Sequence, residues 1–80
     1  MRESLGETVD DSIITTKVKA AFVDDIHVSA LNITVETFKG TVQLSGFADN
    51  ERELERAAEL ARNVNGVKSV KNDIRLKSQS

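Results

Sequence analysis

The residues best suited to acid–base or metal chemistry are the carboxylates and the single histidine near the middle of the chain. Asp24 and Asp25 are adjacent, His27 follows shortly after them, and Glu36 lies further along. An imidazole beside carboxylates can act as a general base, and grouped carboxylates can hold a cation. No spacing here matches a calcium-binding loop, and a chain without Cys and with one His is poorly suited to structural zinc. We therefore interpret His27 as solvated or locally hydrogen-bonded, and we predict a non-enzyme without metal or cofactor.

The glycines do not form a phosphate-binding loop either. The spacing of a phosphate loop, or of the Gly-x-x-Gly clamp of a KH module, is absent from this chain. We interpret Gly40, Gly46 and Gly66 as structural. Gly40 can supply the positive φ of a short hairpin loop, Gly46 can let a helix pass close over the sheet, and Gly66 can end a helix. The net charge of −2 argues against bulk binding of nucleic acid.

Two surface features remain that could bind a partner. The first is a basic stripe near the C-terminus, formed by Lys68, Lys71, Arg75 and Lys77. It could contact anionic lipid headgroups, or it could be a solvated strand edge whose lysines discourage aggregation.

The second feature is aromatic. Phe38 lies beside Lys39 at the expected tip of a hairpin, and Phe47 falls at an outward-facing strand position. These side chains either contact a membrane or a protein partner, or fold back over the rim of the core.

Hydrophobic periodicity predicts the elements that position these residues. Apolar residues at helical spacing predict helices over 11–23 and 50–64, the second with an Asn50–Glu53 capping box. Alternating patterns predict strands over 31–36, 41–47 and 67–77. The first strand should point Leu31, Ile33 and Val35 inward, and the third should bury one polar residue, Asn72, which needs a hydrogen-bonding partner.

This order, α-β-β-α-β, predicts an α+β fold: a two-layer sandwich with a three-stranded mixed sheet and both helices on one face. A crossover through the second helix should make the second and third strands parallel, but the pattern does not say which strand the third one joins. We expect a flexible leader over 1–9, one domain over 10–77 and a tail over 78–80. No apolar run is long enough for a transmembrane segment.

Three motifs resemble those of the BON domain, a family named for bacterial osmotically inducible and nodulation proteins. Residues 9–22, VDDSIITTKVKAAF, are similar to its opening helix. Residues 40–46, GTVQLSG, which follow the strand ITV at 33–35, resemble its Gly-x-Val-x-Leu-Ser-Gly signature. Residues 57–72, AAELARNVNGVKSVKN, resemble its closing helix, Gly-Val turn and final strand. The resemblance covers residues 9–77.

The resemblance implies an envelope protein of a Gram-negative bacterium that is periplasmic, outer-membrane-associated or a lipoprotein, and that responds to osmotic stress. It implies no catalytic residues, and it implies binding to phospholipid surfaces, for which the basic stripe, Phe38 and Lys39 are candidates. The polar N-terminus has no secretory signal, so we expect either a cytosolic protein or a trimmed mature chain. The alternatives are a protein-interaction or oligomerisation module, using the outer sheet face with Thr34, Gln43, Ser45 and Phe47, or cation sensing through the acidic loops.

Overall fold

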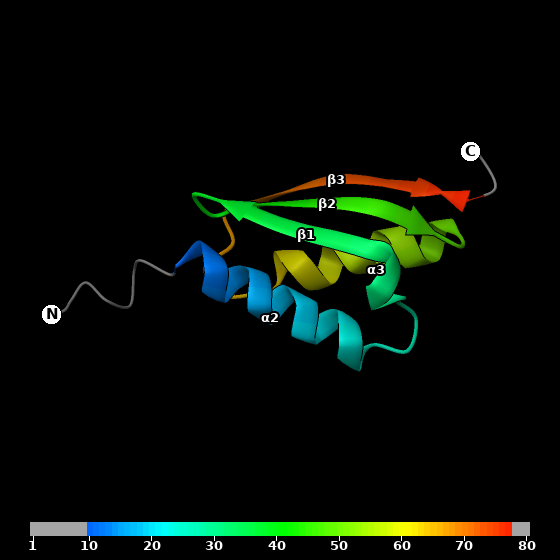
Figure 1. Ribbon diagram of the computed structural model, residues 1–80, viewed down its shortest axis with the longest axis horizontal. Helices are drawn as coiled ribbons and strands as arrows, with labels where there is room; N and C mark the ends of the chain where they lie inside the picture. Colours follow the sequence, from blue (N-terminus) through cyan, green and yellow to red (C-terminus); the bar gives the residue numbers. More distant parts are fainter. Residues whose placement is uncertain (1–9, 78–80) are drawn as a thin grey trace, which may run out of the picture.

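The computed structural model describes residues 10–77 and begins with helix α2, which spans Asp11–Asp24 (Figure 1). Asp10 caps this helix, because its carboxylate accepts a hydrogen bond from the Ser12 amide at 2.8 Å. The buried face of α2 carries Ile14, Val18 and Phe22, as the helical spacing predicts. The predicted leader over 1–9 and tail over 78–80 lie outside the described residues.

Strands β1 (Ile33–Phe38) and β2 (Thr41–Ala48) form the predicted antiparallel hairpin. Phe38 pairs with Thr41, so the loop has only two residues, Lys39 and Gly40, instead of the four expected. Both have positive φ, 52° and 85°, as a type I′ turn requires. The prediction of positive φ at Gly40 is therefore confirmed, and Lys39 adopts a conformation that a residue with a Cβ adopts at some cost.

Asp11 holds this turn in place from the start of α2. Its carboxylate accepts hydrogen bonds from the amides of Lys39 at 2.7 Å and Gly40 at 3.0 Å. By position in the sequence either Asp10 or Asp11 could cap the helix, but the structure divides their roles. Asp10 caps α2, and Asp11 joins the helix to the hairpin.

The prediction that Leu31 points into the core is wrong. A 3₁₀ turn, η1 (Ala30–Asn32), precedes β1 and takes Leu31 out of the strand register, so its side chain is fully exposed. The strand begins at Ile33 because the chain must first turn from the loop after α2 into the sheet. Val28 in that loop is buried.

Helix α3 spans Glu51–Arg62, two residues shorter at its C-terminus than predicted, and Asn50 caps it by accepting a hydrogen bond from the Glu53 amide. The buried face of α3 carries small side chains, largely those of Ala57, Ala58 and Ala61. Strand β3 spans Ser69–Leu76 and begins after the predicted position. Lys68 lies just before this strand, and its amide donates to the carbonyl of Gly40 at 2.8 Å. This hydrogen bond ties the connection from α3 to the hairpin turn.

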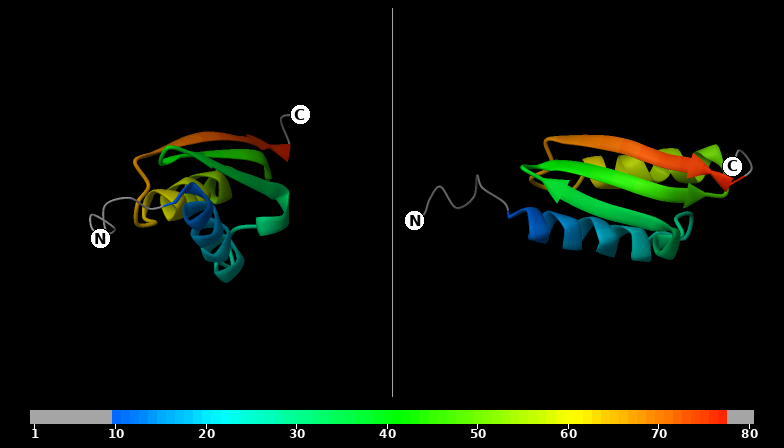
Figure 2. Two further views of the ribbon diagram at one scale, coloured as in Figure 1. Left: turned by 60° about the vertical axis from the view of Figure 1, so that its left-hand side comes forward. Right: turned by 45° about the horizontal axis from the view of Figure 1, so that its top comes forward.

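The sheet order is β1-β2-β3, with β2 in the middle. Strand β3 pairs with β2 and runs parallel to it, which confirms the predicted direction and answers which strand it joins. Both helices lie against the same face of the sheet, and no element within residues 10–77 covers the other face (Figure 2). The fold is therefore the two-layer α/β sandwich predicted from the order of elements. Its core lies between the two layers and contains Ile14, Val18, Phe22, Val28, Ile33, Val35, Val42, Leu44, Ala48, Ala57, Ala61 and Ile74.

At Gly46 another segment of the chain passes close to the backbone, as predicted, but that segment is not the predicted helix. A Cβ at this position would overlap the carbonyl oxygen of Asn32 and lie 3.1 Å from the Cα of Ile33. These atoms belong to the chain entering β1, the strand that pairs with β2 here, and not to a helix passing over the sheet. The backbone at Gly46 also has a φ of 121°, in a region that favours glycine.

Asn72 has the backbone partners that its inward position requires. Its side-chain amide donates to the carbonyl of Leu54 in α3 at 3.3 Å, and its Oδ1 accepts from the amide of Ile74 at 3.2 Å. The side chain therefore links β3 to the helix beneath it.

Candidate functional site

The hairpin tip presents an aromatic side chain and a cation to solvent. Phe38 is 71% exposed, so it does not fold back over the rim of the core. The Lys39 ammonium lies 5.5 Å from the centre of the Phe38 ring, within the range of a cation–π contact. The tip thus combines an apolar surface with a neighbouring positive charge.

Two lysines of the predicted basic stripe lie close to this tip. The side-chain carbons of Lys68 lie against Gly40, close enough that Cγ would be only 2.9 Å from a Cβ at that position. Lys71, in β3, lines a shallow hollow together with Phe38, Lys39 and the acidic Glu36. We call Phe38, Lys39, Lys68 and Lys71 the tip cluster.

The other two residues of the stripe lie elsewhere. Arg75 and Lys77 follow β3 toward the opposite end of the molecule, where β2 also ends and α3 begins (Figure 1). Lys77 forms an ion pair with Asp49 at 3.0 Å. The four basic residues therefore do not form one binding surface, because the stripe runs along the length of the sheet.

Carboxylates are more numerous at the end of the molecule opposite the tip. That end holds the C-terminus of α2 and the N-terminus of α3 (Figure 1). The carboxylates there are Asp24, Asp25, Asp49, Glu51, Glu53 and Glu55. Both ends nevertheless carry charges of both signs. Arg56 and Lys77 form ion pairs among these carboxylates, and Asp10, Asp11 and Glu36 lie near the lysines of the tip cluster.

The open face of the sheet carries the outward residues predicted for it. Thr34 pairs with Ser45, and Gln43 lies beside Lys71 in the strand ladder. The Gln43 side chain donates to Asp73 at 3.2 Å, and Phe47 is partly exposed next to Arg75. This face is mostly polar, with Phe47 near one end and Phe38 at the hairpin tip.

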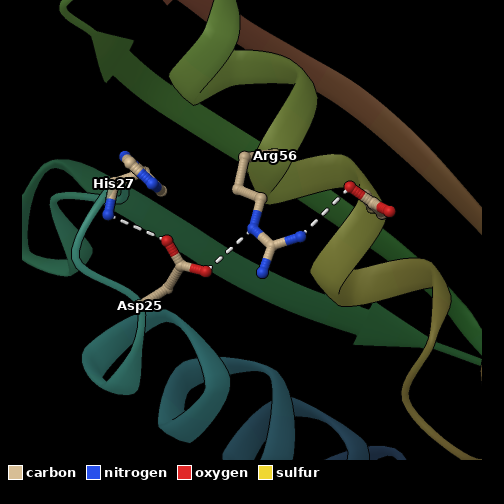
Figure 3. A network of polar contacts seen from close by, with 4 residues as sticks. Asp25, His27 and Arg56 are labelled. Carbon is tan, nitrogen blue, oxygen red and sulfur yellow. Dashed lines mark hydrogen bonds and ion pairs between the residues drawn. The ribbon is translucent and has the colours of Figure 1, made fainter.

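The backbone of His27 takes part in a network of polar contacts with Asp25 and Arg56 (Figure 3). Its backbone amide donates to Asp25 Oδ1 at 2.8 Å, and Arg56 Nε donates to Asp25 Oδ2 at 2.8 Å. Arg56 also contacts Glu59 at 3.2 Å. The His27 amide, followed by the Arg56 side chain, holds the pKa of Asp25 below its ordinary value. This network, which the sequence pattern did not indicate, fastens the loop after α2 to α3.

Acidification is expected to weaken the fold through Asp25. Because the folded-state pKa lies below the unfolded value near 3.8, the contribution of Asp25 is complete above that value and is lost as the pH falls through the folded pKa. Urea unfolding between pH 7 and pH 2.5 should therefore show a smaller acid loss in Asp25→Asn than in the parent protein. His27→Ala keeps the backbone donor and should keep the parental loss. An unchanged profile in Asp25→Asn would contradict this assignment.

The acidic loops do not assemble into a cation site. Among residues 10–77, no group of three His, Asp or Glu side chains is placed to hold a metal ion. Asp25 is engaged by Arg56, so its charge is already balanced. As for membrane segments, none of the described helices has the length and apolar composition needed to cross a bilayer.

Comparison with known proteins gives a family match over all of the described residues. A family model for the BON domain matches residues 10–78. The chain is 40% identical over 73 residues to osmotically-inducible protein Y of Escherichia coli (strain K12), covering 91% of this chain and 36% of that protein. It is 34% identical over 74 residues to an "uncharacterized protein in gshII 5′ region" of Anaplasma centrale, covering 92% and 49%. The chain thus spans between a third and a half of the length of these relatives.

A solved structure is similar in fold. CdsD, a structural protein of the type III secretion system of Chlamydia trachomatis, superposes with a TM-score of 0.73 over 88% of this chain and 33% of that one. The sequence identity is 18%, so this similarity concerns the fold alone.

Proposed function

The chain belongs to the BON domain family, and from this we propose that it is a non-catalytic binding module of the bacterial envelope, related to osmotic stress, that attaches to anionic phospholipid surfaces. The stress role and the envelope location are supported by the family and by the name of the Escherichia coli relative. The lipid role is supported by the tip cluster, in which an exposed ring and three lysines lie at one end of the molecule.

The chemistry of the tip cluster suits the surface of an anionic bilayer. Phe38 is exposed enough to bury its ring among acyl chains, and this gains free energy in proportion to the apolar area removed from water. Lys39 and Lys68 would then lie at the level of the phosphates, since they flank the ring at the turn. Each basic side chain near such a surface contributes about 1 kcal/mol, so three lysines give about a 100-fold gain in partitioning.

The tip cluster orients the domain on such a surface. Negative lipids attract its three lysines, and the larger number of carboxylates lies at the α2 C-terminus and the α3 N-terminus. The domain would therefore stand with its hairpin tip on the membrane and its acidic end toward solution.

Reversing the three lysines of the tip cluster should abolish binding to anionic vesicles. The variant Lys39→Glu/Lys68→Glu/Lys71→Glu should lower partitioning onto phosphatidylglycerol–phosphatidylcholine vesicles by about 100-fold or more, because attraction becomes repulsion. Vesicle co-sedimentation measures this, with phosphatidylcholine vesicles as the zwitterionic reference and circular dichroism as the check of folding.

A matched control separates the site from net charge. Lys17→Glu/Lys19→Glu/Arg75→Glu changes the net charge by the same amount at residues outside the tip cluster, and it should retain most of the binding. An equal loss in both variants would show that general charge, and not the tip, governs association. No binding of the parent protein to either vesicle would refute the lipid role.

A protein-interaction or oligomerisation module is the second candidate, and one observation favours it. The face of the sheet turned away from the helices is covered by no described element, and Phe47 is partly exposed on it (Figure 2). Such a face could pack against a partner domain.

A further inference from the structure

Three exposed aliphatic side chains lie between the end of α2 and the start of β1, and two of them border the edge of β1 that no described strand pairs with. Val23 at the end of α2 is 72% exposed, Ile26 in the following loop 92%, and Leu31 in η1 101%. Val23 and Leu31 line a hollow between α2 and the first half of β1, whose floor includes Phe22, Ile33 and Val35. Lys19 is the one charged residue among the described residues that line it. The tip cluster lies at the other end of β1, so this hollow is a separate feature.

The two edges of the sheet differ in how well they are protected. An edge strand leaves one row of backbone amides and carbonyls without strand partners, and proteins commonly guard such edges with lysines or side-chain caps. Strand β3 carries both: Lys71 and Arg75 are exposed on it, and Asn72 Oδ1 occupies the Ile74 amide. Strand β1, with the sequence ITVETF, has no basic residue and only one charge, Glu36. No described strand pairs with its outer edge, which borders the aliphatic hollow.

We propose that the β1 edge and its hollow receive an extended strand of a partner protein, one that alternates aliphatic and polar residues and carries a carboxylate opposite Lys19. An added strand satisfies the free backbone groups of β1, and every second side chain then points toward the helix layer. In that direction it meets the hollow lined by Val23, Leu31 and Lys19.

Charge favours a different protein over a second copy of this chain. Lys19 lines the hollow together with Val35, near the middle of β1. Antiparallel pairing of β1 with its own copy around Val35 would bring two Lys19 side chains together. Pairing around Glu36 would instead place two Glu36 carboxylates directly opposite each other, which is also destabilising. A partner strand with one carboxylate and flanking aliphatic residues avoids both conflicts.

The test uses a peptide in which threonine alternates with valine and one central valine is replaced by glutamate. Titrated at millimolar concentration into the ¹⁵N-labelled chain, it should shift the amides of β1 saturably and leave those of β3 unchanged. Lys19→Glu should weaken binding of this peptide about three- to tenfold. A second peptide, with lysine in place of the glutamate, should restore the binding to the Lys19→Glu variant. Leu31→Ser should weaken both peptides, whereas Phe47→Ser, an exposed apolar residue elsewhere, should not.

Three results would overturn the proposal. The first is an absence of β1 shifts at millimolar peptide. The second is equal binding of a peptide with a central proline, which cannot pair along the strand. The third is a dimer through β1 in sedimentation equilibrium, since a second copy would then be the occupant. None of these results bears on vesicle binding by the tip cluster, which is measured separately.

Discussion

Replacing Gly46 by alanine is expected to lower the free energy of unfolding by about 3–5 kcal/mol. Two effects add: a φ of 121° strains any residue with a Cβ, and that Cβ would overlap the backbone carbonyl oxygen of Asn32. A domain of this size has a total stability of about 4–12 kcal/mol, so Gly46→Ala should remove a quarter of it or more, and the variant unfolds if the parent lies at the lower end of that range. Urea denaturation followed by far-ultraviolet circular dichroism measures this, since the chain has neither Trp nor Tyr.

Gly40→Ala is the matched control for this prediction. Gly40 also has positive φ, but its Cβ would meet the flexible side chain of Lys68, which can move aside. The loss should therefore be limited to the backbone strain, about 1–2 kcal/mol. Equal stability losses at the two glycines would show that the contact with Asn32 is unimportant.

Replacing Glu53 by alanine is expected to cost about 2–4 kcal/mol. Glu53 is the one charged side chain buried among the described residues, with 4% of its surface exposed. Its two carboxylate oxygens accept hydrogen bonds from the amides of Ser29 at 2.7 Å and Asp49 at 2.9 Å. Removing the carboxylate leaves both donors without their acceptor and detaches the loop before β1 from α3. Urea unfolding gives the cost, and amide hydrogen exchange should accelerate most at Ser29 and Asp49.

Two further variants in α3 serve as controls for this prediction. Glu53→Gln keeps one acceptor oxygen and should lose about half as much stability as Glu53→Ala. Glu55→Ala removes an exposed carboxylate and should change stability by less than about 0.5 kcal/mol. If Glu53→Ala were as mild as Glu55→Ala, the buried carboxylate would not be holding the loop.

Periodicity predicted the elements and their order because burial imposes it. The spacing of Ile14, Val18 and Phe22 needs one face of a helix, and the alternation of Val42 and Leu44 needs one face of a strand. Asn50 predicted the start of α3 because a cap is a local feature of sequence. The parallel direction of β3 followed from the connection through α3. These features depend on residues close to one another in the chain.

The features that were missed depend on contacts between distant segments. Leu31 continues the apolar alternation of β1, and only the path of the chain out of the preceding loop makes it part of a 3₁₀ turn. The links from Glu53 to Ser29 and from Arg56 to Asp25 join α3 to a loop more than twenty residues away. The contact from Asp11 to the hairpin turn had a local hint in the sequence. Asp10 and Asp11 are adjacent, and a single residue is enough to cap a helix, so the second carboxylate was left without an assigned role. The division of the basic stripe depended on the register of β3 with β2.

The direction of the chain at its two boundaries has a practical consequence for labelling. Helix α2 begins beside the hairpin turn, through Asp11, and β3 finishes at the opposite end of the sheet (Figure 1). A fluorescent protein fused upstream of Asp10 would stand next to Phe38 and Lys39, whereas one fused downstream of Leu76 would stand far from them.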